Sequence, residues 1–101
     1  MVYRFLKQND KMPRYFKDQF GRATLSIMLN IAEGSGKFSN KDRRNFYITA
    51  RGSVFECNSI LKFLYDESEV SQELYTEMFN RYEEISRMLY AMIQNLSKEL
   101  K

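Results

Sequence analysis

Glu33 and Glu56 are two carboxylates of this sequence that could in principle do acid and base work in catalysis. The chain contains no His, the commonest general base near neutral pH and the commonest metal ligand. Catalytic triads and His-based zinc sites are therefore excluded. We expect both carboxylates to have a structural role, accepting hydrogen bonds or pairing with Arg22 or Arg51, and we expect the protein not to be an enzyme.

Two further features resemble reactive sites but do not meet their requirements. Residues 34–37 read Gly-Ser-Gly-Lys, but they lack the spacing of a phosphate-binding P-loop and follow a predicted helix, whereas a P-loop follows a strand. The single Cys57 cannot form an internal disulfide or a CxxC pair, which favours a reducing compartment. Its place on an apolar helix face predicts a small core residue. The sequence therefore predicts no metal and no cofactor.

Positive charge is the most informative functional signal in the sequence. Residues 1–51 hold eleven Lys or Arg against four Asp or Glu, a net +7, and residues 52–101 hold five against nine, a net −4. The functional interpretation is a surface that binds the phosphates of RNA or DNA, with little sequence preference and strong salt dependence. Its candidate residues are Arg22, Lys37, Lys41, Arg43, Arg44 and Arg51. The alternative is that the basic half pairs with the acidic half, within the chain or across a subunit contact.

Length and composition predict one helical domain spanning residues 1–101. The chain has 44% apolar residues, one Pro and four Gly, too few turn-forming residues for a small β-barrel. Its longest charge-free stretches are ten residues, in 23–32 and 88–97, against about 20 needed to cross a bilayer. Arg4 and Lys7 interrupt the start of the chain before the apolar core of a signal peptide could form. We therefore expect a cytoplasmic protein with no membrane partner.

The spacing of apolar residues predicts four helices, because apolar side chains recur at steps of three and four along most of the chain. The predicted helices cover approximately residues 2–9, 13–32, 40–66 and 71–98. The first is too short to be stable alone and must pack on the others. With tight connections, the simplest arrangement is all-α, an up-down-up-down antiparallel four-helix bundle with a short first helix.

Polar and small residues mark the helix ends and contacts. Ser39, followed three residues later by Asp42, forms a capping box that starts a helix at residue 40, and Ser71 is the predicted N-cap of the last helix. Gly34 is expected to end the second helix in a left-handed conformation. Gly52 is expected where the backbone of a neighbouring helix approaches closely.

Three stretches resemble the motifs of a known family. Residues 25–34 read LSIMLNIAEG, residues 39–42 read SNKD, and residues 50–56 read ARGSVFE. The chain, from about residue 13 to its end, resembles the four-helix-bundle proteins related to those encoded in intervening sequences of 23S ribosomal RNA genes. The motif residues, for which we expect structural roles, are Asn30, Glu33, Gly34, Gly52, Ser53 and Glu56.

The resemblance implies a bundle without catalytic residues that assembles into homo-oligomers, commonly ring-like pentamers. A related branch comprises accessory proteins of diversity-generating retroelements, thought to bind nucleic acid and a reverse transcriptase through a basic surface. The family's first helix is generally much longer than residues 1–8 of this chain. Either the first helix is truncated here, or a neighbouring subunit covers the exposed apolar seam.

Aromatic residues at helical spacing are mostly expected in the core. Phe55, Phe63 and Tyr65 lie off the predicted core faces, so we expect them in a contact between subunits. The sequence thus predicts a non-enzymatic homo-oligomer with a basic surface that binds RNA or DNA. The alternative is a self-assembling interaction scaffold with no nucleic-acid role.

Overall fold

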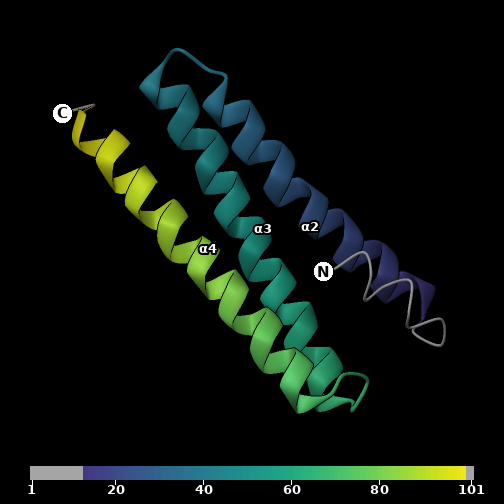
Figure 1. Ribbon diagram of the computed structural model, residues 1–101. Coiled ribbons are helices and arrows are strands. Elements are labelled where there is room, and N and C mark those ends of the chain that lie inside the picture. Colours follow the sequence, from purple (N-terminus) through teal and green to yellow (C-terminus); the bar gives the residue numbers. More distant parts are fainter. Residues whose placement is uncertain (1–12, 100–101) are drawn as a thin grey trace.

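Three antiparallel helices make up the part of the chain that the structure describes, residues 13–99 of a computed structural model. Helix α2 covers Arg14–Ser35, α3 covers Asn40–Asp66 and α4 covers Gln72–Glu99. The helices lie in a row with α3 between α2 and α4, and the two connecting turns lie at opposite ends of the molecule (Figure 1). No strand occurs between residues 13 and 99.

The predicted up-down-up-down four-helix bundle is wrong for the described residues, which form three helices in an up-down-up arrangement. The first predicted helix, residues 2–9, lies outside the described range. The other three predicted helices differ from α2, α3 and α4 by three residues or fewer at each end. Periodicity correctly located these helices because it reports which face each one buries. It does not report how many helices share that core.

Side-chain caps fix where two of the helices begin. The hydroxyl of Ser39 accepts a hydrogen bond from the backbone N of Asp42 at 3.3 Å, and the hydroxyl of Ser71 accepts one from the backbone N of Leu74 at 3.1 Å. Each bond satisfies a backbone donor that the first turn of a helix leaves without a partner. Both caps were predicted from the sequence.

Gly34 and Gly52 differ from prediction in opposite ways. Gly34 lies inside α2 rather than in a left-handed cap, and the C-cap of α2 is Gly36, with φ −87°. A Cβ atom at Gly34 would lie 2.7 Å from Cε1 of Tyr47, so the close approach predicted for Gly52 occurs here instead. At Gly52 a Cβ atom would meet nothing within 4 Å. Gly52 leaves an open space on the surface of α3.

The core lies between α3 and its two neighbours. Its largest fully buried side chains are Phe20, Val54, Cys57, Leu61, Leu64, Met78 and Leu89. Thr24 of α2 joins all three helices, because its Oγ1 shares hydrogen bonds with the hydroxyl of Tyr82 at 3.2 Å and with Sγ of Cys57 at 3.6 Å. Burial raises the pKa of the Cys57 thiol and of the Tyr82 phenol, so both groups are neutral near pH 7.

Candidate nucleic-acid interface

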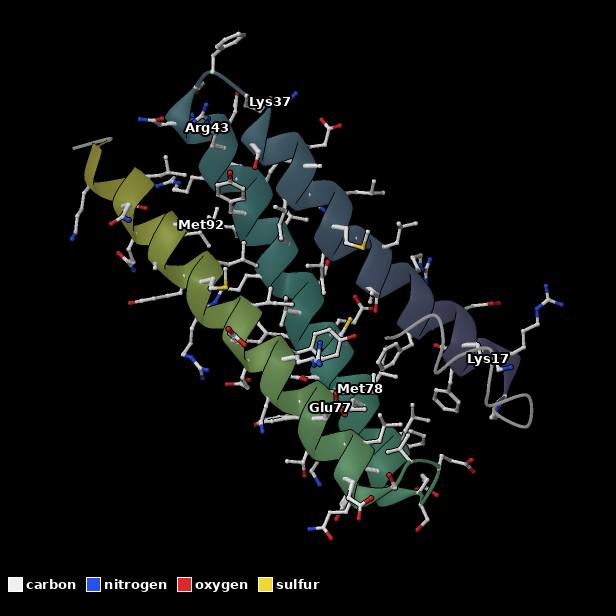
Figure 2. All side chains as sticks on the ribbon, viewed as in Figure 1. Lys17, Lys37, Arg43, Glu77, Met78 and Met92 are labelled. Carbon is white, nitrogen blue, oxygen red and sulfur yellow. The ribbon has the colours of Figure 1, made fainter. Side chains whose placement is uncertain are left out.

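The turn between α2 and α3 brings four of the predicted basic residues to one end of the molecule. The turn is held by backbone bonds from Gly36 N to the carbonyls of Ala32 and Glu33, and from Lys37 N to Gly34 O. Nε of Arg43 donates to the backbone carbonyl of Lys37 at 2.5 Å. We call Lys37, Lys41, Arg43 and Arg44 the basic turn; Figure 2 labels Lys37 and Arg43 at this end.

The four residues of the basic turn differ in their exposure and in their contacts with other side chains. Nζ of Lys37 lies 3.7 Å from a carboxylate oxygen of Glu33 and 5.3 Å from the ring centre of Phe46. Lys41 is exposed, and Arg43 and Arg44 are half-buried. The Nε atom of Arg44 is buried without a hydrogen-bond partner among the described residues. None of these four cations has a cross-helix ion pair within residues 13–99.

Arg22 and Arg51, the other two candidates, lie away from the basic turn. Arg22 is thirteen residues before the end of α2, about 20 Å along the helix axis, and donates to Oε1 of Gln19 at 2.6 Å. Arg51 lies on the surface between α3 and α4. The structure therefore divides the six predicted residues into one cluster and two separate sites.

Arg51 is held between two aromatic rings. Its guanidinium carbon lies 5.0 Å from the ring centre of Phe55 and 4.9 Å from that of Tyr90, and its Nε donates to Oγ of the buried Ser86 at 3.2 Å. A planar cation suits this stacked geometry. Arg51 therefore links α3 to α4 and does not pair with Glu33 or Glu56, as the sequence had suggested.

Negative charge gathers at the opposite end, around the turn between α3 and α4. Asp66, Glu67, Glu69 and Glu73 lie there, separated from the basic turn by the length of α3, about 40 Å. Ion pairs between described residues join partners four positions apart, within one helix or, for Glu33 and Lys37, between the end of α2 and the turn that follows it. The predicted alternative of pairing between the two halves of the chain is therefore not seen among residues 13–99.

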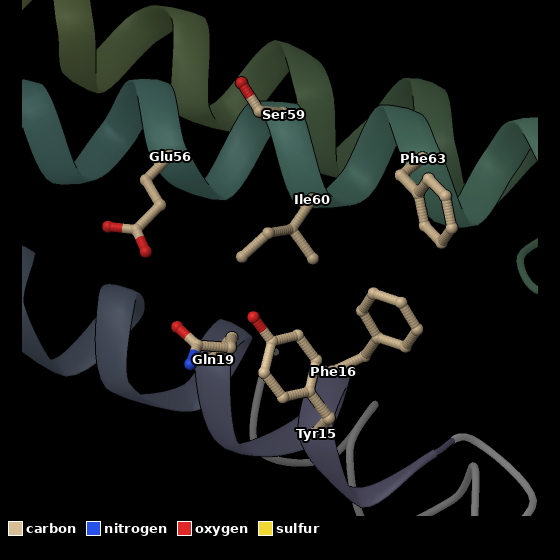
Figure 3. Close-up of a pocket in the computed structure, with 7 residues that line it drawn as sticks. All are labelled: Tyr15, Phe16, Gln19, Glu56, Ser59, Ile60 and Phe63. Carbon is tan, nitrogen blue, oxygen red and sulfur yellow. The ribbon is translucent and has the colours of Figure 1, made fainter.

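Glu33 and Glu56 do not form a carboxylate pair. Glu33 is two residues from the end of α2 and pairs with Lys37, whereas Glu56 lies sixteen residues into α3. The two positions are roughly 20 Å apart along the helix axes. Figure 3 shows Glu56 beside Ile60 in an opening between α3 and α2, with Gln19 on the opposite side. No cluster of potential metal-binding side chains occurs in the described part of the chain.

Asn30 and Ser53, two of the motif residues, join α2 to α3. Nδ2 of Asn30 donates to the backbone carbonyl of Ser26 at 2.8 Å and to its hydroxyl at 3.1 Å. The same hydroxyl shares a 2.8 Å hydrogen bond with Oγ of the buried Ser53. This network satisfies polar groups where the two helices meet, which is a structural role.

Phe38 is the functional candidate that sequence reasoning missed. It lies between α2 and α3, next to Lys37, and its side chain is 100% exposed. Helical spacing identifies aromatic residues of the core and of subunit contacts, and Phe38 belongs to no helix. A signal was present, because an aromatic residue in a short turn between two Lys residues has no apolar face to join.

A second candidate surface is a groove between α3 and α4. It is lined by Ile48, Arg51, Gly52, Phe55, Tyr90, Ile93 and Gln94, and we call it the α3–α4 groove. Ile48, Phe55 and Tyr90 are each about half exposed there. Phe63, also expected in a subunit contact, is exposed but stacks on Phe16 at 5.0 Å. Tyr65 is half-buried and stacks on Tyr75 of α4 at 4.3 Å, so it has a partner within the chain.

No helix in residues 13–99 has the length and apolar character required to cross a membrane.

Comparison with curated proteins finds no match. The fold is similar to a solved structure from Bacteroides thetaiotaomicron VPI-5482, described as a protein with unknown function from the S23 ribosomal protein family. The TM-score is 0.86 with 24% sequence identity, over 91% of this chain and 87% of that one. The model of the 23S rRNA-intervening sequence protein family matches residues 1–91, and the chain belongs to that family.

Proposed function

We propose that this chain is a non-enzymatic, cytoplasmic protein that assembles with copies of itself and binds RNA or DNA through the basic turn. The observation that carries the proposal is the basic turn itself, whose four cations lie together at one end of the molecule. The acidic residues around the turn between α3 and α4 are about 40 Å away. Such a surface attracts phosphates by releasing their counterions. A ring of subunits, such as the pentamer that the family resemblance implies, would present several copies of it.

The arrangement of carboxylates supports a non-enzymatic role. Two-carboxylate catalysis requires the groups to lie within about 10 Å of each other on either side of a substrate. The positions of Glu33 and Glu56 are too far apart for this, and Glu33 pairs with Lys37 of the basic turn.

Charge reversal with a matched control tests the nucleic-acid proposal. Lys41→Glu lies in the first turn of α3, where a negative charge also favours the helix dipole, so the fold should be retained. We expect it to weaken binding of a labelled RNA or DNA oligonucleotide and to reduce the salt slope by about one. Arg87→Glu, on the exposed surface of α4, makes the same change in net charge and should leave binding nearly unchanged. No binding by the wild type at low salt, or equal effects of both variants, would refute the proposal.

The alternative function is a self-assembling scaffold that binds no nucleic acid. The α3–α4 groove favours it, because half-exposed Ile48, Phe55 and Tyr90 line one continuous surface. Ile48→Lys should reduce the mass measured by light scattering, whereas Met28→Lys, on the exposed face of α2, is the matched control. Assembly through the groove should persist at high salt. An assembly in which the basic end of one copy contacts the acidic end of the next should dissociate at high salt. A monomer at both low and high salt would refute self-assembly altogether.

A further inference from the structure

We propose that Phe38 is a stacking platform for an unpaired nucleobase, so that the basic turn binds single-stranded nucleic acid in preference to duplex. This inference rests on the proposed function and names its ligand class. The ligand that fits Phe38 and the basic turn is a flat nucleobase with both faces free, attached to a chain of phosphates.

The backbone on both sides of Phe38 is fixed. Before it, the N–H of Lys37 donates to Gly34 O, and the carbonyl of Lys37 accepts from Arg43. After it, Ser39 is the N-cap of α3. The structured turn therefore fixes the backbone that carries the solvent-exposed Phe38 ring. This lowers the conformational entropy that is lost when a base stacks on the ring.

Other exposed aromatic residues differ from Phe38 because they contact neighbours in the chain. Phe55 and Tyr90 flank the guanidinium of Arg51, and Phe63 stacks on Phe16. These three rings are 45–49% exposed, whereas Phe38 is fully exposed. Phe38 thus offers both ring faces, and it does so within the sequence Lys37-Phe38-Ser39-Asn40-Lys41.

Single-stranded nucleic acid matches this combination of groups. Proteins that bind single strands combine cations along the phosphate chain with aromatic rings on which bases stack. A duplex keeps its bases stacked on each other, so it could use the cations but not the ring. Stacking on one ring does not distinguish RNA from DNA, because it does not involve the 2′-hydroxyl.

Two substitutions at Phe38 separate aromatic stacking from simple apolar contact. Phe38→Leu keeps an apolar side chain without a π-face, and we expect it to weaken binding of a single-stranded RNA or DNA 20-mer about tenfold. Binding of the matching duplex should stay unchanged. Phe38→Trp should bind single strands at least as well as the wild type. Phe63→Leu makes the same exchange at an exposed Phe near the acidic end and is the matched control.

Fluorescence gives a direct readout of stacking. The chain has no Trp, so Phe38→Trp introduces its sole indole. Stacking of a base on the indole should quench its emission when single-stranded oligonucleotide is added, with little change for duplex. Because Phe38 is fully exposed, neither Phe38→Leu nor Phe38→Trp should alter the melting temperature, which circular dichroism would check.

The outcomes separate this inference from the proposed function. Equal binding of single strands by the wild type and Phe38→Leu would overturn stacking and leave nucleic-acid binding intact. If Phe38→Leu weakened the binding of single strands and of duplex equally, stacking would also be overturned, since Phe38 would then affect the structure of the whole basic turn. A wild type that binds neither oligonucleotide at low salt would refute the nucleic-acid proposal, and the inference with it.

Discussion

The ring of Tyr47 lies against the backbone of Gly34, so that a Cβ atom at Gly34 would be 2.7 Å from Tyr47 Cε1. Tyr47 is buried, and its hydroxyl shares a 3.1 Å hydrogen bond with Ser35 Oγ at the end of α2. The ring therefore cannot move aside freely. This contact sets how closely the end of α2 approaches the start of α3, and thus the geometry of the basic turn.

Gly34→Ala should destabilise the protein by about 1 kcal/mol. Overpacking a filled site costs about 1–3 kcal/mol, and the better helix propensity of Ala returns about 0.5–1 kcal/mol. Urea unfolding followed by circular dichroism would measure the change in the free energy of unfolding. Gly52→Ala is the control, because no atom lies within 4 Å of its new Cβ, and it should stabilise by about 0.5–1 kcal/mol. Changes of the same sign in both variants would contradict this account.

Ser68, in the turn between α3 and α4, has a positive φ of 61°. A left-handed conformation is unfavourable for residues with a Cβ atom and worst for β-branched ones. Ser68→Gly should therefore raise the free energy of unfolding by about 0.5 kcal/mol, after the larger entropy of the unfolded Gly chain is subtracted. Ser68→Val should lower it by about 1 kcal/mol. Thermal melts of both variants would show opposite shifts, and a stabilising Val would contradict the expected strain.

Alkaline pH should destabilise the fold through Cys57 and Tyr82. Burial raises the pKa of both groups in the folded protein, whereas in the unfolded chain they ionise at about 8.5 and 10. Near pH 7 both are neutral in both states, so their contribution is constant there. Above about pH 9 the unfolded chain releases protons that the folded chain retains, and stability falls as pH rises. Urea midpoints from pH 7 to 11 would show the decline. Cys57→Ala and Tyr82→Phe should each make it shallower, and an unchanged slope in both would contradict the assignment.

Arg51→Lys should weaken the link between α3 and α4, although it keeps the positive charge. A Lys ammonium cannot stack flat on both Phe55 and Tyr90 while donating to Ser86. Each cation–π contact at a partly exposed site contributes about 0.5–1 kcal/mol, so we expect a loss of about 1 kcal/mol. A double-mutant cycle with Tyr90→Leu would measure the coupling. Full additivity of the two changes would show that the stack contributes nothing.

Local features were predicted well from the sequence, and features that depend on a neighbouring helix were not. The Ser39 and Ser71 caps were predicted because a cap depends on residues three positions away. The close approach was assigned to Gly52 instead of Gly34, since a requirement for close approach depends on what packs opposite. The same limit explains why Arg51 was predicted among the nucleic-acid-binding residues, when the rings of Phe55 and Tyr90 and the Ser86 hydroxyl hold it between α3 and α4.

The order of the helices in the row has a consequence for how the chain folds. Among the helices of residues 13–99, backbone contacts join those consecutive in sequence, α2 with α3 and α3 with α4. Each pairing closes a turn of a few residues, so native contacts form between segments that are near each other along the chain. Domains of this kind fold within about microseconds to milliseconds. The α2–α3 hairpin, with the basic turn at its tip, is already complete in sequence before α4 leaves the ribosome, so this end of the molecule can take shape first during synthesis.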